Sequence, residues 1–200
     1  RRRKAKVGTS YIGSPPRPLR RETTTVDSAR TTAPPLRLRV GRALVESARL
    51  LAVWAHVALV VLVVAGLSAL LTHGVWLAVL LGGLLLLVAG LVAAGIATAA
   101  KWLLIGRVRR ADHPLWSSFV WRNELADTFT EILAAQWFAR AASGTVALVW
   151  WLRAMGARIG TGVWCETYWL PESDLIDLRD GATVNAGCVV QTHLFHDRVL

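Results

Sequence analysis

The chain has 200 residues, of which 54% are hydrophobic and only 18% are charged, and its formal net charge at pH 7 is +10. Residues 1–49 carry thirteen Arg and Lys against three acids, residues 50–100 carry no Asp, Glu, Lys or Arg, and residues 111–200 carry six basic and ten acidic residues. This distribution excludes an ordinary soluble globular domain and predicts three different environments along the chain.

The basic arm has neither an initiator Met nor an apolar segment within its first forty residues, so we interpret its start as a cut inside a longer protein. Residues 22–49 read as a basic linker that anionic lipid would attract. Nucleic-acid binding is not predicted, because the arm lacks interleaved aromatic side chains that could stack on bases.

Residues 50–100 predict a transmembrane helical hairpin. One crossing needs about 20 apolar residues, so the 51 uncharged residues suit two crossings, at Leu50–Leu71 and Val75–Ala97, with Thr72–Gly74 as the turn. Basic residues flank the pair on both sides, which places both termini in the cytoplasm and predicts a multi-pass protein of the inner (plasma) membrane. His56 and His73 lie near the expected helix ends and are interpreted as interface histidines without a special role.

Residues 101–156 predict interfacial or amphipathic helices. Ser117 or Ser118 can cap a helix, and apolar residues from Phe119 to Trp137 recur at roughly helical spacing. The many tryptophans of this segment suit a helix lying on the bilayer, and packing against the next domain explains them equally well. Gly144–Leu152 is too short to cross a membrane.

Residues 157–200 show a six-residue periodicity that is typical of a parallel β-helix. Gly181 and Gly187 would occupy corners. The positions expected to point inward are Trp164, Leu170, Ile176, Ala182 and Cys188, together with Leu178, Val184 and Val190. Because these residues make only about two coils, we expect the β-helix to continue beyond Leu200. The predicted fold class is therefore an α+β membrane protein, with a two-helix transmembrane hairpin and amphipathic helices followed by the start of a left-handed parallel β-helix.

Two stretches resemble known families. "VGTSYIGSPPRPLRR" (residues 7–21), with Gly13, Ser14 and Pro15 as its turn, resembles the exit of a hexapeptide-repeat acyltransferase, so residues 1–21 would be the tail of a preceding domain. "GARIG" with "DGATVNAGCVVQTHLFHDR" resembles the C-terminal membrane region of ε-poly-L-lysine synthetase and related nonribosomal peptide synthetases. In that family, adenylation and thiolation domains precede membrane helices, which alternate with hexapeptide-acetyltransferase-like domains.

The resemblance implies acyl transfer from a carrier thioester to an amino-acid amine, which forms a poly-amino-acid chain. His193 is the candidate catalytic base, because imidazole exchanges protons near neutral pH. Asp197 is the candidate group that orients it, and His196 is a weaker candidate base. No cofactor is expected within these residues, since phosphopantetheine would sit on a carrier domain elsewhere in the protein.

The implied partners are membrane lipid, the carrier and adenylation domains of the same polypeptide, and neighbouring hexapeptide domains. Cys165 and Cys188 are interpreted as reduced thiols, and they lack the companion ligands that a metal site needs. Two other hypotheses stay open at this point: a free-standing, membrane-associated hexapeptide acyltransferase, and a non-catalytic membrane scaffold.

Overall fold

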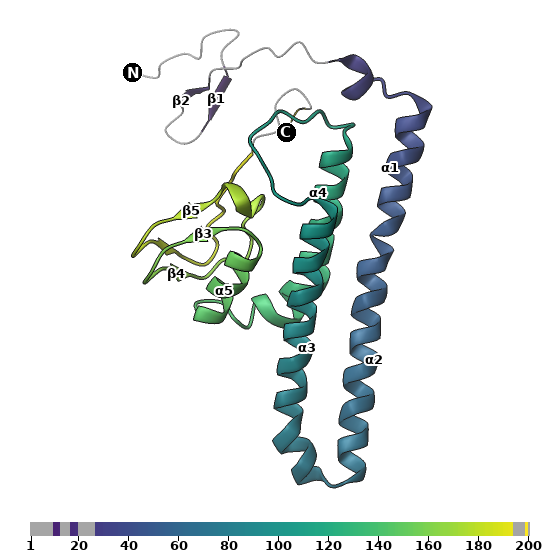
Figure 1. Ribbon diagram of the computed structural model, residues 1–200, viewed down its shortest axis with the longest axis vertical. Helices are drawn as coiled ribbons and strands as arrows, with labels where there is room; N and C mark the ends of the chain where they lie inside the picture. Colours follow the sequence, from purple (N-terminus) through teal and green to yellow (C-terminus); the bar gives the residue numbers. More distant parts are fainter. Residues whose placement is uncertain (1–9, 13–16, 20–26, 194–198, 200) are drawn as a thin grey trace, which may run out of the picture.

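A long helical part and a smaller part made of short strands lie side by side in the computed structural model (Figure 1). The structure describes residues 10–12, 17–19, 27–193 and 199. Near the start of the chain, β1 (Ser10–Ile12) pairs with β2 (Arg17–Leu19) in antiparallel fashion. The turn expected at Gly13–Pro15 lies outside the described residues, and so do His196 and Asp197.

The helical hairpin consists of α1 (Leu36–Ala48), α2 (Leu50–Thr72) and α3 (Val75–Leu104). Its turn is at the expected place, where Gly74 adopts a φ of 128°. Side chains disfavour this conformation, so glycine suits the reversal. α3 continues to Leu104, seven residues past the end expected at Ala97. Lys101, expected to follow the helix in water, is instead buried within it and ion-paired.

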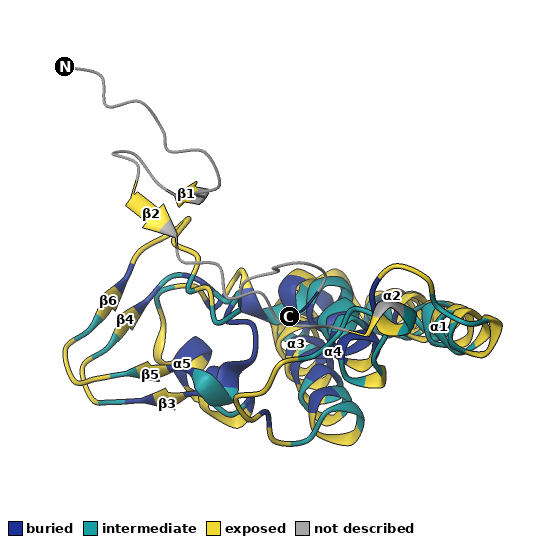
Figure 2. Ribbon diagram, turned by 90° about the horizontal axis from the view of Figure 1, so that it is seen from above, coloured by how far each residue is buried: buried dark blue, intermediate teal, exposed yellow. Residues whose placement is uncertain are grey.

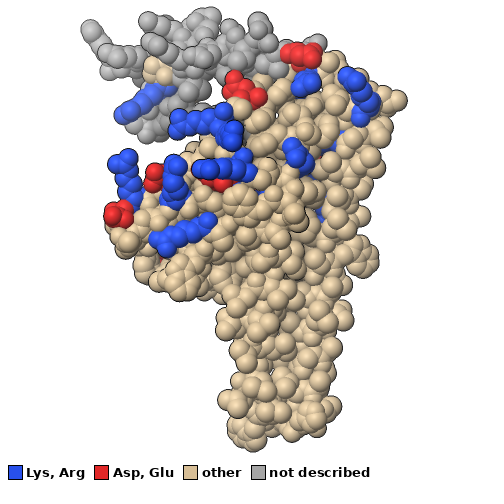
Figure 3. Space-filling model, viewed as in Figure 1, with Lys and Arg blue, Asp and Glu red and all other residues tan. Residues whose placement is uncertain are grey.

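The hairpin exposes an unusually apolar surface. The first long helical run, Leu36–Thr72, comprises α1 and α2, and only 17% of its apolar 18-residue window is buried. For α3 the buried share of such a window is 33%. The core helix of a soluble protein would hide most of such a window. Figure 3 shows the free end of the hairpin without any charged side chain. Both helices are therefore long and apolar enough to cross a membrane.

Two further helical segments pack along the upper part of the hairpin. α4 (Ser118–Phe129) begins at Ser117, whose hydroxyl accepts the Val120 amide at 3.4 Å, as a capping serine should. It continues into η2 (Thr130–Ala139), a π-helix, which is a rare conformation. Its inner face is mostly alanine, and it approaches α3 closely at Gly90.

The histidine expected to lie idle at an interface makes a specific contact with this segment. His56 Nδ1 lies 3.1 Å from Trp137 Nε1 and 3.1 Å from the Ile132 carbonyl oxygen, so the ring contacts two residues of η2. At the top of the bundle, Glu124 of α4 bonds Arg42 at 2.6 Å and Arg49 at 2.8 Å. These contacts fix α1 and the start of α2 against α4.

The strand part consists of α5 (Val146–Ala154), β3 (Arg158–Ile159), β4 (Trp164–Cys165), β5 (Asp177–Leu178) and β6 (Thr183–Val184), with a 3₁₀ turn, η3 (Ser173–Leu175). β3 pairs with β5 and β4 with β6, both in parallel. In Figure 2 the two pairs form opposite walls, with α5 between them. The buried side chains there include Leu148, Leu152, Cys165, Ile176 and Val184.

Both parallel pairs have the same register. Arg158 faces Asp177 and Trp164 faces Thr183, an offset of nineteen residues each time. Three six-residue repeats would give eighteen, so one extra residue lies between β4 and β5. This insertion changes the inward set: Trp164 is 51% exposed and Cys188 is exposed, contrary to expectation, whereas Val184 is buried as expected. Four short strands do not by themselves make a β-helix.

A buried ion pair joins the two parts. Lys101 Nζ lies 2.7 Å from Asp174 Oδ2, and both side chains are about 5% exposed. The same carboxylate oxygen accepts the Val108 amide at 3.0 Å. Neither charge could stay buried without the other, because an unpaired buried charge costs several kcal/mol.

Gly90→Ala should destabilise the packing of η2 on α3. A Cβ there would lie 2.6 Å from the Trp137 carbonyl oxygen, so backbone must move, at a cost of about 1–3 kcal/mol. Thermal unfolding in detergent measures the effect. Gly83→Ala is the matched control, since a Cβ there meets nothing within 4 Å. Equal melting temperatures for the two variants would contradict the packing.

Lys101→Met should lower the free energy of unfolding by about 3–5 kcal/mol, because it leaves the Asp174 carboxylate buried without a countercharge. Chemical denaturation in detergent tests this. Arg158→Gln is the control: its partner Asp177 lies 3.6 Å away and the side chains are 65% and 50% exposed, so the loss should stay under about 1 kcal/mol. Equal losses for the two variants would show that the buried pair is not the link.

Candidate functional site

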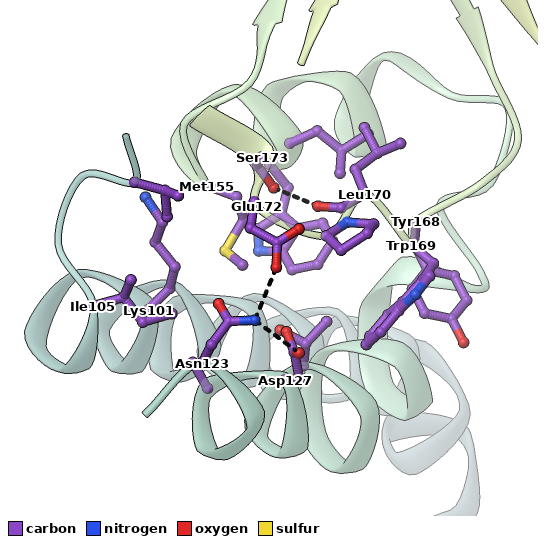
Figure 4. Close-up of a pocket in the computed structure, with 16 residues that line it drawn as sticks. Lys101, Ile105, Asn123, Asp127, Met155, Tyr168, Trp169, Leu170, Glu172 and Ser173 are labelled. Atoms are coloured by element: carbon purple, nitrogen blue, oxygen red, sulfur yellow. Dashed lines mark hydrogen bonds between the residues drawn. The ribbon is translucent and has the colours of Figure 1, made fainter. Parts of the chain in front are cut away.

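The candidate site is centred on Glu172, in the turn that precedes η3. Its side chain is only 3% exposed, and its backbone φ of 42° is in the left-handed region. Such a conformation costs a non-glycine residue roughly 1–3 kcal/mol and persists only where surrounding contacts hold it. One of these contacts is visible in Figure 4: Asn123 of α4 donates its amide to Glu172 Oε1 at 3.0 Å.

The other carboxylate oxygen of Glu172 holds His193. The distance from His193 Nδ1 to Glu172 Oε2 is 2.7 Å, and the histidine side chain is 23% exposed. The Thr192 hydroxyl also bonds Glu172 Oε2, and it lies 3.0 Å from the Pro171 carbonyl. A carboxylate that faces Nδ1 favours the tautomer with the proton on Nδ1. The lone pair is then on Nε2, which gives His193 the arrangement of a general base.

The sequence identified the histidine of this pair but not its carboxylate. Asp197, the expected orienting group, lies outside the described residues, and the carboxylate that the structure places against His193 Nδ1 is that of Glu172. The only local signal was the turn-forming stretch Pro171–Asp174. Glu172 and His193 lie twenty-one positions apart in the chain, and they meet where the turn at Pro171 and Glu172 contacts Thr192 and His193.

A second carboxyl lies next to the pair. Asn123 also approaches Asp127, with a distance of 3.5 Å from its amide nitrogen to Asp127 Oδ2 (Figure 4). Burial, and then the negative charges of Glu172, Glu124 and Glu131, raise the pKa of Asp127 from 3.8 to about 7, while Arg49 opposes the rise. Asp127 therefore exchanges a proton near neutral pH beside the Glu172–His193 pair.

Three hollows surround these residues. The inner one, between Lys101, Asp127 and Glu172, leaves only about 30 Å³ for the centre of a water molecule, so it admits water and not a substrate. Two larger recesses both reach His193. One, of about 280 Å³, is lined by Arg109, Arg110 and His113 among others, and one, of about 210 Å³, by Asp127, Trp169 and Gln191 among others.

His113, at the rim of the larger recess, was not singled out in the sequence. It stacks on Phe119 with ring centroids 3.8 Å apart, and burial lowers its pKa, with Asp112 opposing. Within the described residues, no group of three His, Cys, Asp or Glu side chains could hold a metal ion. The chemistry that the site can carry is proton transfer, by an imidazole held against a buried carboxylate between two recesses.

The folded protein should lose stability between pH 4 and pH 7 through Asp127. Its pKa is higher in the folded chain, so folding binds a proton in this window, and raising the pH favours the unfolded state. The loss amounts to at most about 4 kcal/mol, at about 1.4 kcal/mol per pKa unit.

Asp127→Asn should remove this slope and raise the stability above pH 7, as measured by denaturation in detergent at several pH values. Asp177→Asn, an exposed carboxylate on β5, serves as the control and should keep the slope. A slope that survives in Asp127→Asn would assign the titration to another group.

Comparison with known proteins gives one informative relative. No protein-family model matches the chain, and no solved structure matches it. The delta-poly-L-ornithine synthetase of Acinetobacter baumannii (strain AB307-0294) is 37% identical over 105 residues, which are 52% of this chain and 8% of that protein. The chain thus spans less than a tenth of the relative's length, and it is similar to one part of a poly-amino-acid synthetase.

Proposed function

We propose that this chain is the membrane-anchored part of a poly-amino-acid synthetase, in which the Glu172–His193 pair catalyses amide-bond formation. The similarity to a delta-poly-L-ornithine synthetase supports a synthetase-like role. The observation that carries the catalytic part is the 2.7 Å contact between His193 Nδ1 and the buried Glu172 carboxylate. Buried carboxylates of this kind orient the histidine base of acyl-transfer enzymes.

The reaction would join an acyl thioester, delivered on a carrier domain, to the side-chain amine of an amino acid. The amine nitrogen attacks the thioester carbon, and Nε2 of His193 takes the proton that the nitrogen loses. The C–N bond forms and the C–S bond breaks. The departing sulfur recovers a proton from the imidazolium, which resets the histidine. Glu172 holds the ring and stabilises its cationic form throughout.

The two recesses at His193 suit two substrates. The recess beside Arg109 and Arg110 offers guanidinium groups to the phosphate of a phosphopantetheine arm, which would carry the acyl group. The recess on the other side has Asp127 and the indole of Trp169, groups that suit an ammonium. This chain would accordingly work with a carrier and an adenylation domain of the same polypeptide.

The strand part is proposed to be a coil of a left-handed β-helix like those of hexapeptide acyltransferases. The equal offsets of its two parallel pairs support this reading, as does the inward position of Leu178, Val184 and Val190 against one core. The hairpin would anchor this part in the plasma membrane, with both termini in the cytoplasm, as the basic flanks favour.

His193→Ala, in the complete enzyme, should lower polymer formation by about 10²–10⁴-fold and leave the loading of amino acid onto the carrier unchanged, because general-base catalysis contributes a factor of this size. Glu172→Gln should lower kcat in the same direction, with the KM for the amino acid nearly constant. Polymer length and amount, and carrier loading, are read by mass spectrometry in the same samples.

His73→Ala is the matched control, because this histidine lies in the hairpin turn, far from the site (Figure 1). Its polymer output should equal that of the unchanged enzyme. Normal polymer output from folded His193→Ala would leave the strand part without a catalytic role and would favour a scaffold. Loss of carrier loading as well would mean that the substitution disturbs the whole enzyme.

A further inference from the structure

One face of α5 is apolar, exposed and not explained by the proposed chemistry. Val146 is 61% exposed and Trp150 is 66% exposed, and the two lie one helical turn apart on the same face. The opposite face, with Leu148, Trp151 and Leu152, fills the core. Trp164 of β4, 51% exposed, lies against Gly144 just before the helix. We call Val146, Ala147, Trp150 and Trp164 the Trp150 surface.

The contacts of α5 with α3 give the distance of this surface from the hairpin turn, measured along the hairpin. The indole nitrogen of Trp151 is 3.3 Å from the Ala94 carbonyl and 3.1 Å from the Thr98 hydroxyl. Ala94 is nineteen residues from Val75, where α3 starts at the turn. At about 1.5 Å per residue this is about 29 Å. The hydrocarbon core of a bilayer is about 30 Å thick.

The free end of the hairpin is too short to cross this core alone. η2 already covers α3 at Gly90, which contacts Trp137, and fifteen residues separate Gly90 from Val75. That leaves about 22 Å of free helix at about 1.5 Å per residue. A bilayer of normal thickness would therefore reach past the end of η2 to the level of the Trp150 surface.

The composition of the surface suits this level. Tryptophan is enriched where hydrocarbon meets headgroups. Arg153, three residues after Trp150, is held by the strand part, because its guanidinium donates to the Ile159 carbonyl at 2.7 and 3.0 Å and to the Gly160 carbonyl at 2.7 Å. The charged side chains of the molecule gather above the free end of the hairpin in Figure 3.

We propose that the Trp150 surface is a lipid-binding face that dips into the near leaflet of a phospholipid bilayer. α5 then contacts lipid with one side and the core of the strand part with the other. The proposal rests on the proposed membrane insertion of the hairpin.

The face also sets the height of the catalytic site. Lys101, which pairs with Asp174 next to Glu172, is twenty-six residues from Val75, or about 39 Å along α3 at about 1.5 Å per residue. The Glu172–His193 pair is thereby held about 10 Å above the hydrocarbon, at the outer edge of the headgroups. Both substrates would have to reach it along the membrane surface.

Site-directed spin labelling tests the proposal on the full chain in vesicles of phosphatidylcholine and phosphatidylglycerol. Cys188, the exposed native thiol, is replaced by serine in every sample, and the chain without added cysteine gives the background from buried Cys165. Labels are placed at Trp150→Cys, at Leu62→Cys on the free hairpin and at Arg37→Cys, an exposed position near the start of α1 that lies thirty-five residues, or about 52 Å of helix, from Thr72. Accessibility to oxygen and to a water-soluble nickel chelate gives the depth of each label.

We expect the Leu62 and Trp150 labels to be reached by oxygen and shielded from nickel, with the Trp150 label shallower, and the Arg37 label to be reached by nickel. A Trp150 label that nickel reaches, with the Leu62 label in lipid, overturns the lipid-binding face and leaves the anchored hairpin intact. A Trp150 label shielded from both reagents means a protein contact, which also overturns it. A Leu62 label in water rejects the anchored hairpin together with this proposal.

Discussion

The buried pair between Lys101 and Asp174 is the constraint on which the rest of the structure depends. It fastens the top of an apolar hairpin to the turn that carries Glu172, at a distance of 2.7 Å. Each of the two buried charges needs the other, because a buried charge without a countercharge strongly lowers the free energy of unfolding. The pair thus fixes where the strand part sits relative to the hairpin. It also brings the strained residue Glu172 within reach of Asn123 on α4.

The residues of the candidate site meet at this junction between the helical part and the strand part. Glu172 holds His193 across twenty-one residues of chain, and the adjacent Thr192 hydroxyl lies 3.0 Å from the Pro171 carbonyl. Asn123 of the helical part donates to the Glu172 carboxylate and also approaches Asp127, so the site has groups from both sides of the junction. A change in the packing of the hairpin against the strand part would therefore change the geometry of the site, and a substitution in the site would change the stability of the protein.

The same arrangement links the proposed reaction to the bilayer. The apolar part of α3 is long enough to cross a membrane, and Lys101, the buried cation of this helix, lies just beyond the end of that part. α5 lies beside this boundary with one face in the core and one face of valine and tryptophan outside. A carrier-bound acyl group and an amine would meet at a site held close to the headgroups.

The sequence by itself determined the hairpin and its turn at Thr72–Gly74, because an uncharged run of 51 residues has the length of two membrane-spanning helices joined by a short turn. It also singled out His193 as a candidate base, through the resemblance of the surrounding stretch to poly-amino-acid synthetases. Only the tertiary structure decided its partner Glu172, the buried role of Lys101 and the exposed position of Trp164. These depend on the single residue inserted between β4 and β5, and on charges 73 residues apart, which no local pattern can reveal.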